Sequence, residues 1–340
     1  MINQPQTNTP GWISQKLASL SNVLLDPTIV LSFDRTGYWR HSRQFGTKDL
    51  DVDLKGRVCV VTGANSGIGF ATSVALAQRG ADVWLVCRNN QRGHEARDRI
   101  QSQTGNHRVF VVQLDVSDLA AISAMQWPDA LDRVDVLVHN AGVLLKEPEH
   151  NRQGLELTLA THLVGPLALT GQLLSRLQQG TDQRLIWVSS GGMYTQRLDV
   201  DELSDSSSKF DGVRAYARAK RAMVVLAEFL AVQPALKGIG VYCMHPGWVN
   251  TPGVKHSIPT FWRITRSILR TPEQGADTVV WLAVARTIQK STGYFWFDRQ
   301  RRQTHLLSKT QETPAERVKL WRCLNEWSGV DEKIWNAKRI

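Results

Sequence analysis

Tyr216 and Lys220 are the residues of this chain whose types and spacing point most directly to chemistry. They stand four positions apart in a segment with helical patterning, so both side chains project from one face. An ammonium beside a phenol lowers the phenol's pKa, which makes the tyrosine usable as a general acid or base near neutral pH. Ser189 and Ser190 end an apolar run that predicts a buried strand, and a hydroxyl there could polarise a carbonyl. A Tyr-x-x-x-Lys pair is otherwise common on solvated helix faces, so its meaning depends on the surrounding elements.

A glycine-rich turn between Arg57 and Gly69 predicts a nucleotide-binding site. Its sequence, RVCVVTGANSGIG, is an apolar β-branched run followed by glycines and the start of an apolar helical pattern. A buried strand that turns into a helix places backbone N–H groups and the positive helix end around a phosphate, and glycine lets the backbone approach a pyrophosphate. Many such turns are only tight turns, but this position between strand and helix favours nucleotide binding. The residues expected to contact the cofactor are Gly63, Asn65, Ser66, Gly67, Ile68 and Gly69.

Arg88 and Asn89 follow the second predicted strand, at the point that faces the adenosine ribose in a dinucleotide-binding fold. An acidic residue there favours NAD, whereas an arginine suits the 2′-phosphate of NADP. Arg88 follows Gly69 by 19 positions (88 − 69), close to the expected separation of about 20. The sequence therefore predicts NADP(H) as the cofactor, preferred over NAD(H).

Small and polar residues follow the third and fourth predicted strands. Asp115 is placed to meet the adenine amino group, or else to cap a helix that begins near Ser117. Asn140, Ala141 and Gly142 supply small residues where the cofactor can approach the backbone. Both sets extend the predicted cofactor site along the carboxyl ends of the strands.

Strand and helix signals alternate regularly through the middle of the chain. The expected strands are 57–62, 82–87, 108–114, 134–139, 184–189, 239–244 and 293–297, and the expected helices are about 67–79, 90–103, 117–126, 153–179, 213–232 and 273–286. Fully apolar strands between helices predict an α/β fold, a doubly wound (Rossmann) seven-stranded parallel sheet with helices on both faces. The expected parts are an N-terminal arm (1–55), an NADP-binding domain with a long loop near 250–272 (56–300), and a C-terminal helical extension (301–340).

The bulk properties exclude several classes of function. Lys and Arg exceed Asp and Glu by 41 to 31, but the basic residues are scattered; the densest run is Arg299–Arg302, so we expect no nucleic-acid partner. Cys59, Cys87, Cys243 and Cys323 have no metal-like spacing, so we expect no metal and a reducing compartment. We find neither a signal-peptide core nor an apolar run of transmembrane length, and expect a cytoplasmic protein.

Two amphipathic segments leave a choice between packing and peripheral membrane contact. The arm has apolar residues at helical spacing between Trp12 and Leu25, and could pack on the domain or lie on a membrane surface. Apolar and basic side chains mark opposite faces of a short helix within the 250–272 loop: Phe261, Ile264 and Ile268, against Arg263, Arg266 and Arg270. That helix could cover a substrate, rest on anionic lipid or pack on the core.

Taken together, these motifs resemble the short-chain dehydrogenases/reductases. The matches occur in the family's order: Thr62-Gly63-x-x-x-Gly67-Ile68-Gly69, Asn140-Ala141-Gly142, Ser190, Tyr216-x-x-x-Lys220 and Pro246-Gly247. The resemblance covers about residues 55–300, and so many matches in register are highly specific. Longer stretches resemble one subgroup of the family more closely: VSSGGM (188–193), FDG (210–212), MHPGW (244–248), TPGV (251–254) and QGADT (274–278).

The resemblance implies strand order 3-2-1-4-5-6-7 and an NADP(H)-linked enzyme that interconverts a carbonyl and an alcohol. By position, Tyr216 would donate or accept the proton, Lys220 would hold the nicotinamide ribose and depress the tyrosine's pKa, and Ser190 would orient the carbonyl oxygen. The 250–272 loop would be a lid, which suggests a lipophilic aldehyde or ketone. Members often pair through the helices after the fourth and fifth strands, so a homo-oligomer is an expectation. The residues implied to line the nicotinamide are Pro246, Gly247 and Thr251.

His162 departs from the family pattern, which has an asparagine whose backbone carbonyl holds a water that connects the lysine to solvent. Pro166 has no N–H to give to the carbonyl four residues earlier, so the His162 carbonyl should be free for a water. We predict that these two residues reconstitute the relay, with the imidazole able to add a titratable step. The alternative is a packed helix residue and an impaired relay.

Two other functions stay open on the sequence. A non-catalytic NADP(H)-binding protein would keep the glycine turn and Arg88 but lack a complete catalytic set, and only His162 points that way. A membrane-surface interaction protein would rely on the arm and on the basic face that includes Arg263.

Overall fold

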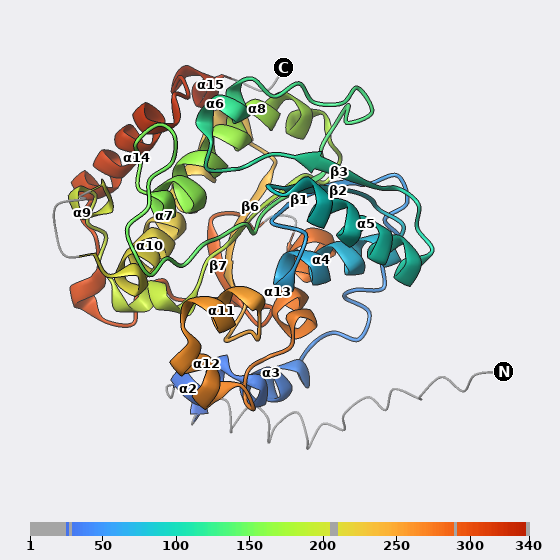
Figure 1. Ribbon diagram of the computed structural model, residues 1–340, viewed down its shortest axis with the longest axis horizontal. Helices are drawn as coiled ribbons and strands as arrows, with labels where there is room; N and C mark the ends of the chain where they lie inside the picture. Colours follow the sequence, from blue (N-terminus) through green and yellow to red (C-terminus); the bar gives the residue numbers. More distant parts are fainter. Residues whose placement is uncertain (1–24, 27–28, 205–209, 289–290, 338–340) are drawn as a thin grey trace.

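An eight-stranded sheet with the order β3-β2-β1-β4-β5-β6-β7-β8 organises the fold (Figure 1). The structure, a computed structural model, describes residues 25–26, 29–204, 210–288 and 291–337. The strands are β1 (Val58–Thr62), β2 (Asp82–Cys87), β3 (Val109–Gln113), β4 (Val136–His139), β5 (Arg184–Val188), β6 (Gly240–His245), β7 (Tyr294–Phe297) and β8 (Gln300–Arg302). The first seven strands are parallel, which confirms the predicted doubly wound sheet and its order.

Strand β8 adds an antiparallel edge that the sequence did not predict. Its three residues are polar and basic, so they lack the apolar run by which the parallel strands were found. Their side chains are used in pairing: Arg302 is bonded to Asp26, and Arg301 lies over Tyr294. The Arg299–Arg302 run is therefore structural and not a free basic surface.

Helices cover both faces of the sheet and enclose two apolar cores. One face carries α4 (Gly67–Gln78), α5 (Asn90–Thr104) and α13 (Pro272–Val284). The other carries α6 (Leu119–Ser123), α7 (Leu157–Leu159), α8 (Gly165–Gln179), α10 (Gly212–Leu230), α14 (Pro314–Ser328) and α15 (Lys333–Asn336). In both cores the sheet side chains are fully buried, for example Val61 and Leu137 at 0% exposure. This packing fixes the carboxyl ends of the strands, where the candidate site residues lie.

The helix after β4 is interrupted where the sequence predicted one continuous helix over 153–179. A π-helical turn, Ala160–Val164, separates α7 from α8, and Pro166 lies in the first turn of α8. A proline cannot donate its backbone nitrogen to the preceding turn, which explains why the regular ladder breaks here. His162 lies at the centre of this break.

Short helices from distant parts of the chain gather at one end of the molecule (Figure 1). They are α2 (Ile29–Phe33) and α3 (Arg35–Ser42) of the N-terminal arm, and α11 (Pro252–Ser257) and α12 (Pro259–Thr265) of the 250–272 loop; α9 (Asp201–Ser204) lies elsewhere. The apolar segment between Trp12 and Leu25 lies outside the described residues, except for Leu25 itself. The described part of the arm packs directly against the loop.

One helical stretch among the described residues, Leu157–Gln179, is long and apolar enough to cross a bilayer, with a mean hydropathy of 1.3. This corrects the expectation that no run reaches that length. Its apolar window is 83% buried within the fold, as in a core helix. Helices α14 and α15 pack on it from outside: Val330 and Ile334 lie against Gly171 of α8.

Candidate active site

The glycine turn after β1 forms a tightly packed cradle in which side chains would not fit. Gly63 and Gly67 have φ angles of +64° and +54°, a conformation that favours glycine. A Cβ on Gly63 would lie 2.8 Å from the Cα of Ala141, and one on Gly69 would overlap the carbonyl of Gly63. The backbone N–H groups at the start of α4 thus stay open at the carboxyl edge of the sheet, as an anion site requires. Asn65, Ser66 and Ile68 complete this predicted group.

Asn140 and Thr62 fasten the cradle to β4. The Asn140 side-chain amide donates to the Thr62 carbonyl at 2.9 Å and to the Gly63 carbonyl at 3.3 Å. The Thr62 hydroxyl accepts the backbone N–H groups of Asn140 and Ala141, each at 3.0 Å. Asn140 therefore holds the turn in shape, a role that its sequence position alone did not reveal.

Arg88 and Asp115 line a cavity of about 520 Å³ beyond the end of β2. The Arg88 side chain is 68% exposed, and its nearest carboxylate oxygen, on Asp115, is 3.9 Å away. Asn89 caps α5 by accepting the Arg92 N–H at 2.9 Å. Asp115 does not cap the following helix, which was the second of the two roles predicted for it. Helix α6 begins at Leu119 and is capped by Asp118. Asp115 instead accepts two hydrogen bonds from Ser117.

Ser190, Tyr216 and Lys220 meet at the carboxyl end of β5. The Ser190 side chain is hydrogen-bonded with the Tyr216 phenol, and Lys220 Nζ lies 5.5 Å from the Tyr216 ring centroid. Lys220 is 3% exposed and donates to the Val188 carbonyl at 2.8 Å. Ser189 points the other way and donates to the Lys220 carbonyl at 2.9 Å. The second serine is thus the one that faces the tyrosine, as the resemblance implied.

The electrostatics of this cluster differ from the expectation that Lys220 lowers the phenol's pKa. Burial raises the pKa of Tyr216, and the hydrogen bond from Ser190 offsets this only in part. Burial lowers the pKa of Lys220 to about 7. The sequence could give the spacing of the two groups but not their desolvation, which depends on the helices packed around them.

His162 is fully buried beside Tyr216, and their ring planes are at 89°. Its Nε2 lies 3.1 Å from the backbone nitrogen of Val143 and 2.8 Å from its carbonyl oxygen. Burial lowers the pKa of His162 well below its ordinary value, and the charge of Lys220 lowers it further. The imidazole is therefore neutral near pH 7, so the titratable step offered for it is not supported. A Cβ on Gly142 would overlap the ring, so this glycine makes room for the histidine.

The Pro246–Gly247 turn follows β6 and approaches the glycine turn through Thr251. Gly247 has φ +81°, and a Cβ there would overlap the side chain of Arg270. The Thr251 side chain would lie 3.1 Å from a Cβ on Gly67, and its hydroxyl caps α11. The structure thus brings these nicotinamide-lining candidates beside the cradle.

The 250–272 loop is two short helices and not the single amphipathic helix that was predicted. Phe261 packs edge-on against Trp248 with ring centroids 5.4 Å apart. Ile264, expected on the apolar face, is 75% exposed, and Arg270, expected on the basic face, is fully buried. Helix α12 ends at Thr265, so the helical spacing assumed through Arg270 does not apply. We refer to residues 250–269 as the lid.

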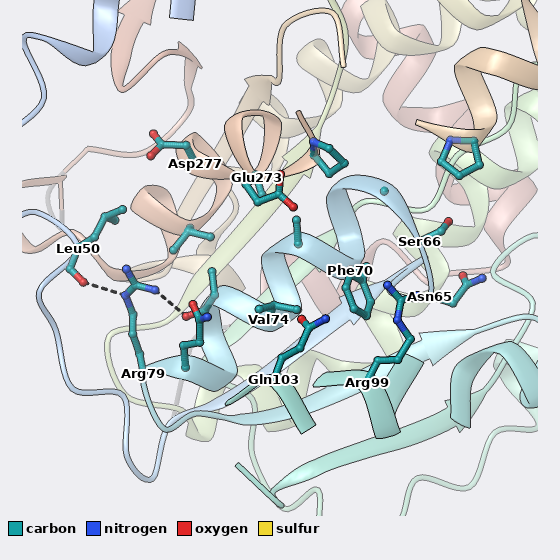
Figure 2. A pocket seen from close by; sticks show the side chains of 18 residues that line it. Leu50, Asn65, Ser66, Phe70, Val74, Arg79, Arg99, Gln103, Glu273 and Asp277 are labelled. Carbon is teal, nitrogen blue, oxygen red and sulfur yellow. Dashed lines mark hydrogen bonds between the residues drawn. The ribbon is translucent and has the colours of Figure 1, made fainter. Parts of the chain in front are cut away.

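A groove of about 570 Å³ runs along the outer face of α4 and does not contain the catalytic candidates (Figure 2). It reaches the cradle only at Asn65, Ser66 and Gly67. Most of the rest of its wall comes from α4, α5 and α13, including Phe70, Val74, Arg99, Glu273 and Asp277, with Leu50, Arg79 and Pro252 outside these helices. The chemistry of Tyr216 therefore belongs to the opposite side of the glycine turn.

Several residues that build the site were missed from the sequence. His245 accepts the Gly191 N–H at 2.9 Å, directly after Ser190. Arg270 pairs with Asp298, and Asp298 pairs with His41, all three buried. The sequence offers one hint of this cluster: Asp298 is a charged residue directly after the apolar strand β7. Among the described residues, no group of three or more His, Cys, Asp or Glu side chains is placed to hold a metal.

Comparison with known proteins agrees with this geometry. The sequence profile of the short chain dehydrogenases matches residues 57–260. Cattle (Bos taurus) dehydrogenase/reductase SDR family member 12 is 41% identical over 86% of this chain and 93% of its own length. Mouse (Mus musculus) retinol dehydrogenase 11 is 32% identical over 75% of this chain and 82% of its own.

Solved structures share the fold as well. A Beutenbergia cavernae protein named as an NAD(P)-dependent gluconate 5-dehydrogenase, solved with bound NADP, is 26% identical. It superposes with a TM-score of 0.57 over 72% of this chain and 95% of its own. The parallel sheet, the glycine cradle and the Ser190–Tyr216–Lys220 cluster thus occur together with significant sequence identity across most of the chain. The chain belongs to the short-chain dehydrogenase family of oxidoreductases.

Proposed function

We propose that this protein uses NADP(H) to interconvert a carbonyl and an alcohol on a lipophilic aldehyde or ketone. The observation that carries the proposal is the meeting of Ser190, Tyr216 and Lys220 at the strand end, beside the glycine cradle. A phenol that bonds a serine hydroxyl and lies beside an ammonium is arranged for proton transfer to or from a substrate oxygen.

The residues present fit a phosphorylated dinucleotide. The cradle made by Gly63, Gly67 and Gly69 excludes side chains where a pyrophosphate would approach the backbone. Arg88 points an exposed guanidinium toward solvent, with only a distant carboxylate contact, and would bind a 2′-phosphate. Asp115 would lie by the adenine. When bound, the nicotinamide supplies or accepts a hydride at C4.

The protein's own groups would orient the substrate and move the proton. Ser190 would donate a hydrogen bond to the substrate oxygen, and Tyr216 would transfer a proton to or from that oxygen. The buried Lys220 ammonium would bind the nicotinamide ribose. Asn140, Ala141 and Gly142 would let the cofactor lie against the backbone.

Aromatic and apolar side chains support a lipophilic substrate. Met193 follows Ser190 closely and is fully buried, while Trp248 packs against Phe261 of the lid. A relative in mouse is named for retinol, a lipophilic alcohol. The apolar and aromatic types of these side chains support this class of substrate.

A second proposal concerns where the protein acts. We propose a cytoplasmic protein that contacts membranes peripherally through α2, α3 and α12, which lie together at one end (Figure 1). Large apolar side chains are exposed on these helices: Ile29, Leu31, Trp39 and Ile264. The exposed Arg263 and Arg266 lie on α12 or directly after it, and would favour an anionic surface. Flotation of the protein with phosphatidylserine vesicles tests this membrane contact. The double variant Arg263→Glu, Arg266→Glu should no longer float with the vesicles. Unchanged flotation of the variant would contradict the proposal.

The enzymatic proposal is tested by NADPH oxidation with a panel of aldehydes and ketones of increasing chain length. We expect turnover that improves with chain length and is lost in Tyr216→Phe. Tight NADPH binding without turnover of any member would favour the non-catalytic binding protein instead.

A further inference from the structure

The N-terminal arm, here residues 29–42, is bonded to both ends of the lid. The backbone N–H of Trp248, just before the lid, donates to the Phe33 carbonyl at 2.7 Å. The backbone N–H of Arg35 donates to the Ile268 carbonyl, at the lid's other end, at 2.8 Å. The two lid ends also pair with each other, since Arg270 N–H donates to the Trp248 carbonyl at 2.7 Å. Three consecutive arm residues thus span the base of the lid.

Buried Arg270 joins the arm to the Pro246–Gly247 turn. Its guanidinium donates to the carbonyls of Ser32 at 2.9 Å, Asp34 at 3.0 Å and Pro246 at 3.4 Å. It is packed so closely against Gly247 that a Cβ there would overlap it. The arm backbone therefore helps to set the position of a turn that we expect to line the nicotinamide.

A chain of buried charges fixes Arg270 in this place. Asp298 accepts two bonds from Arg270, at 2.6 and 2.8 Å, and lies 2.6 Å from Nδ1 of His41. Nε2 of His41 lies 2.8 Å from Asp26. Asp298 and Arg299 have φ angles of +47° and +58°, a strained conformation for such residues that persists only where the surroundings impose it. His41 of the arm, through its contact with Asp298, is one of the residues that impose this conformation.

Phe33 makes the third connection, to the loop that carries Ser190. Its ring lies 4.4 Å from the ring of His245 and 5.1 Å from that of Phe297. A Cβ on Gly191 would contact the Phe33 ring at 2.5 Å, so the ring lies directly against this backbone. His245 bonds the Gly191 N–H on the same side. Phe33 is thus packed behind the residue that follows the catalytic serine.

We propose that residues 32–41 of the arm are a positioning element of the active site, with Phe33 and His41 as its positioning residues. They hold the Ser190–Gly191 loop, the Pro246–Gly247 turn and the lid in one arrangement. The catalytic part of this inference rests on the proposed function. The structural part does not, and it can be measured on the protein alone.

The test compares Phe33→Ala and the conservative Phe33→Leu with two controls in the full chain. Leu320→Ala removes a buried side chain (1% exposed) from the distant helix α14, and Val318→Ala removes a 49% exposed side chain from the same helix. Hydrogen–deuterium exchange is followed on peptides covering 189–196, 246–271 and, as an internal reference, 82–104. NADPH oxidation with nonanal is measured in parallel.

We expect Phe33→Ala to speed exchange in 189–196 and 246–271 by about tenfold or more while 82–104 is unchanged. It should also lower kcat for nonanal more than Leu320→Ala does, with Phe33→Leu restoring most of both. Val318→Ala should leave all readouts unchanged. Should Phe33→Ala fail to fold, His41→Gln should give the same local increase in exchange.

The proposal would be overturned if Phe33→Ala increased the exchange rate equally in all three peptides, or if Phe33→Ala and Leu320→Ala had equal effects. In either case the arm would contribute only to the general stability of the fold. If wild type turns over no substrate, the proposed function fails, but the exchange experiment still decides whether the arm holds the loops.

Discussion

The His162 ring lies edge-on to the ring of Tyr216, with centroids 5.3 Å apart. His162 itself is part of a π-helical turn in the helix after β4. Pro166 has no N–H to donate to the His162 carbonyl, as a regular helix would require, and our prediction remains that this carbonyl accepts a water that serves Lys220. The imidazole itself stays neutral because it is buried. The backbone, and not the side chain, is thus the part of His162 suited to a proton relay.

His162→Asn should therefore change turnover little, within about threefold of wild type, because the backbone carbonyl and Pro166 are kept. The variant should be less stable, since the smaller side chain leaves space beside Gly142 and loses the contact with Val143. Steady-state kinetics and thermal unfolding measure the two effects. A sharp increase in turnover would show that the native relay is impaired.

Arg88→Asp should reverse the cofactor preference. Loss of the guanidinium should weaken NADPH binding by about 10- to 100-fold, corresponding to the ~1.5–3 kcal/mol of a hydrogen bond to a charged group. NADH binding should be little changed, since NADH has no 2′-phosphate. Fluorescence titration measures both, with Arg97→Asp on the neighbouring helix α5 as a control of equal charge change. Equal losses for both cofactors would contradict the role given to Arg88.

Lys220 predicts a pH dependence with a definite sign. Its pKa of about 7 lies below the ordinary value of 10.5, so the ammonium is lost as pH rises through about 7. Because kcat/KM reports the free enzyme, its value for carbonyl reduction should fall above pH about 7. For stability, the unfolded chain binds the proton more tightly, so Lys220→Met should stabilise the protein most below pH 7 and least above pH 10.5. A stabilisation independent of pH would contradict the buried ammonium.

His41 makes the opposite contribution to stability. Burial alone lowers its pKa, but the hydrogen bonds that the protonated ring donates to Asp26 and Asp298 outweigh this, and the pKa is raised above 6.5. The stabilisation is therefore fully present below pH 6.5 and is lost as pH rises through the higher pKa of the folded state. The other cations of this network are Arg270, which bonds Asp298, and Arg40 and Arg302, which pair with Asp26. The midpoint of urea unfolding should thus fall with rising pH in wild type and less so in His41→Gln; parallel curves would exclude this linkage.

The sheet could be predicted from the sequence because its strands carry the signal by themselves. Seven apolar runs between helical patterns define a parallel sheet, and the three residues of β8 lack such a run. The helix after β4 has clear apolar periodicity, but only the tertiary structure shows how the chain accommodates Pro166.

The candidate site was predicted only where neighbouring residues define it. The glycine turn and the Tyr216–Lys220 spacing are local motifs, and the structure brings them together. The partners of Arg270 are remote: Asp298 is 28 positions away and Asp34 is 236. Helical spacing placed Arg270 on a solvated face because the sequence does not show that α12 ends at Thr265. Burial, which raises the pKa of Tyr216, likewise depends on packing that no local pattern reports.

The central claim, hydride exchange with Tyr216 handling the proton, is tested most directly by deuterium transfer. The protein is incubated with NADPH labelled with deuterium at C4 and with aldehydes of increasing length, and the alcohols are analysed by mass spectrometry. We predict one deuterium on the former carbonyl carbon, formed at least about 100-fold more slowly by Tyr216→Phe. Bound NADPH that yields no deuterated alcohol, or an unimpaired Tyr216→Phe, would contradict the account.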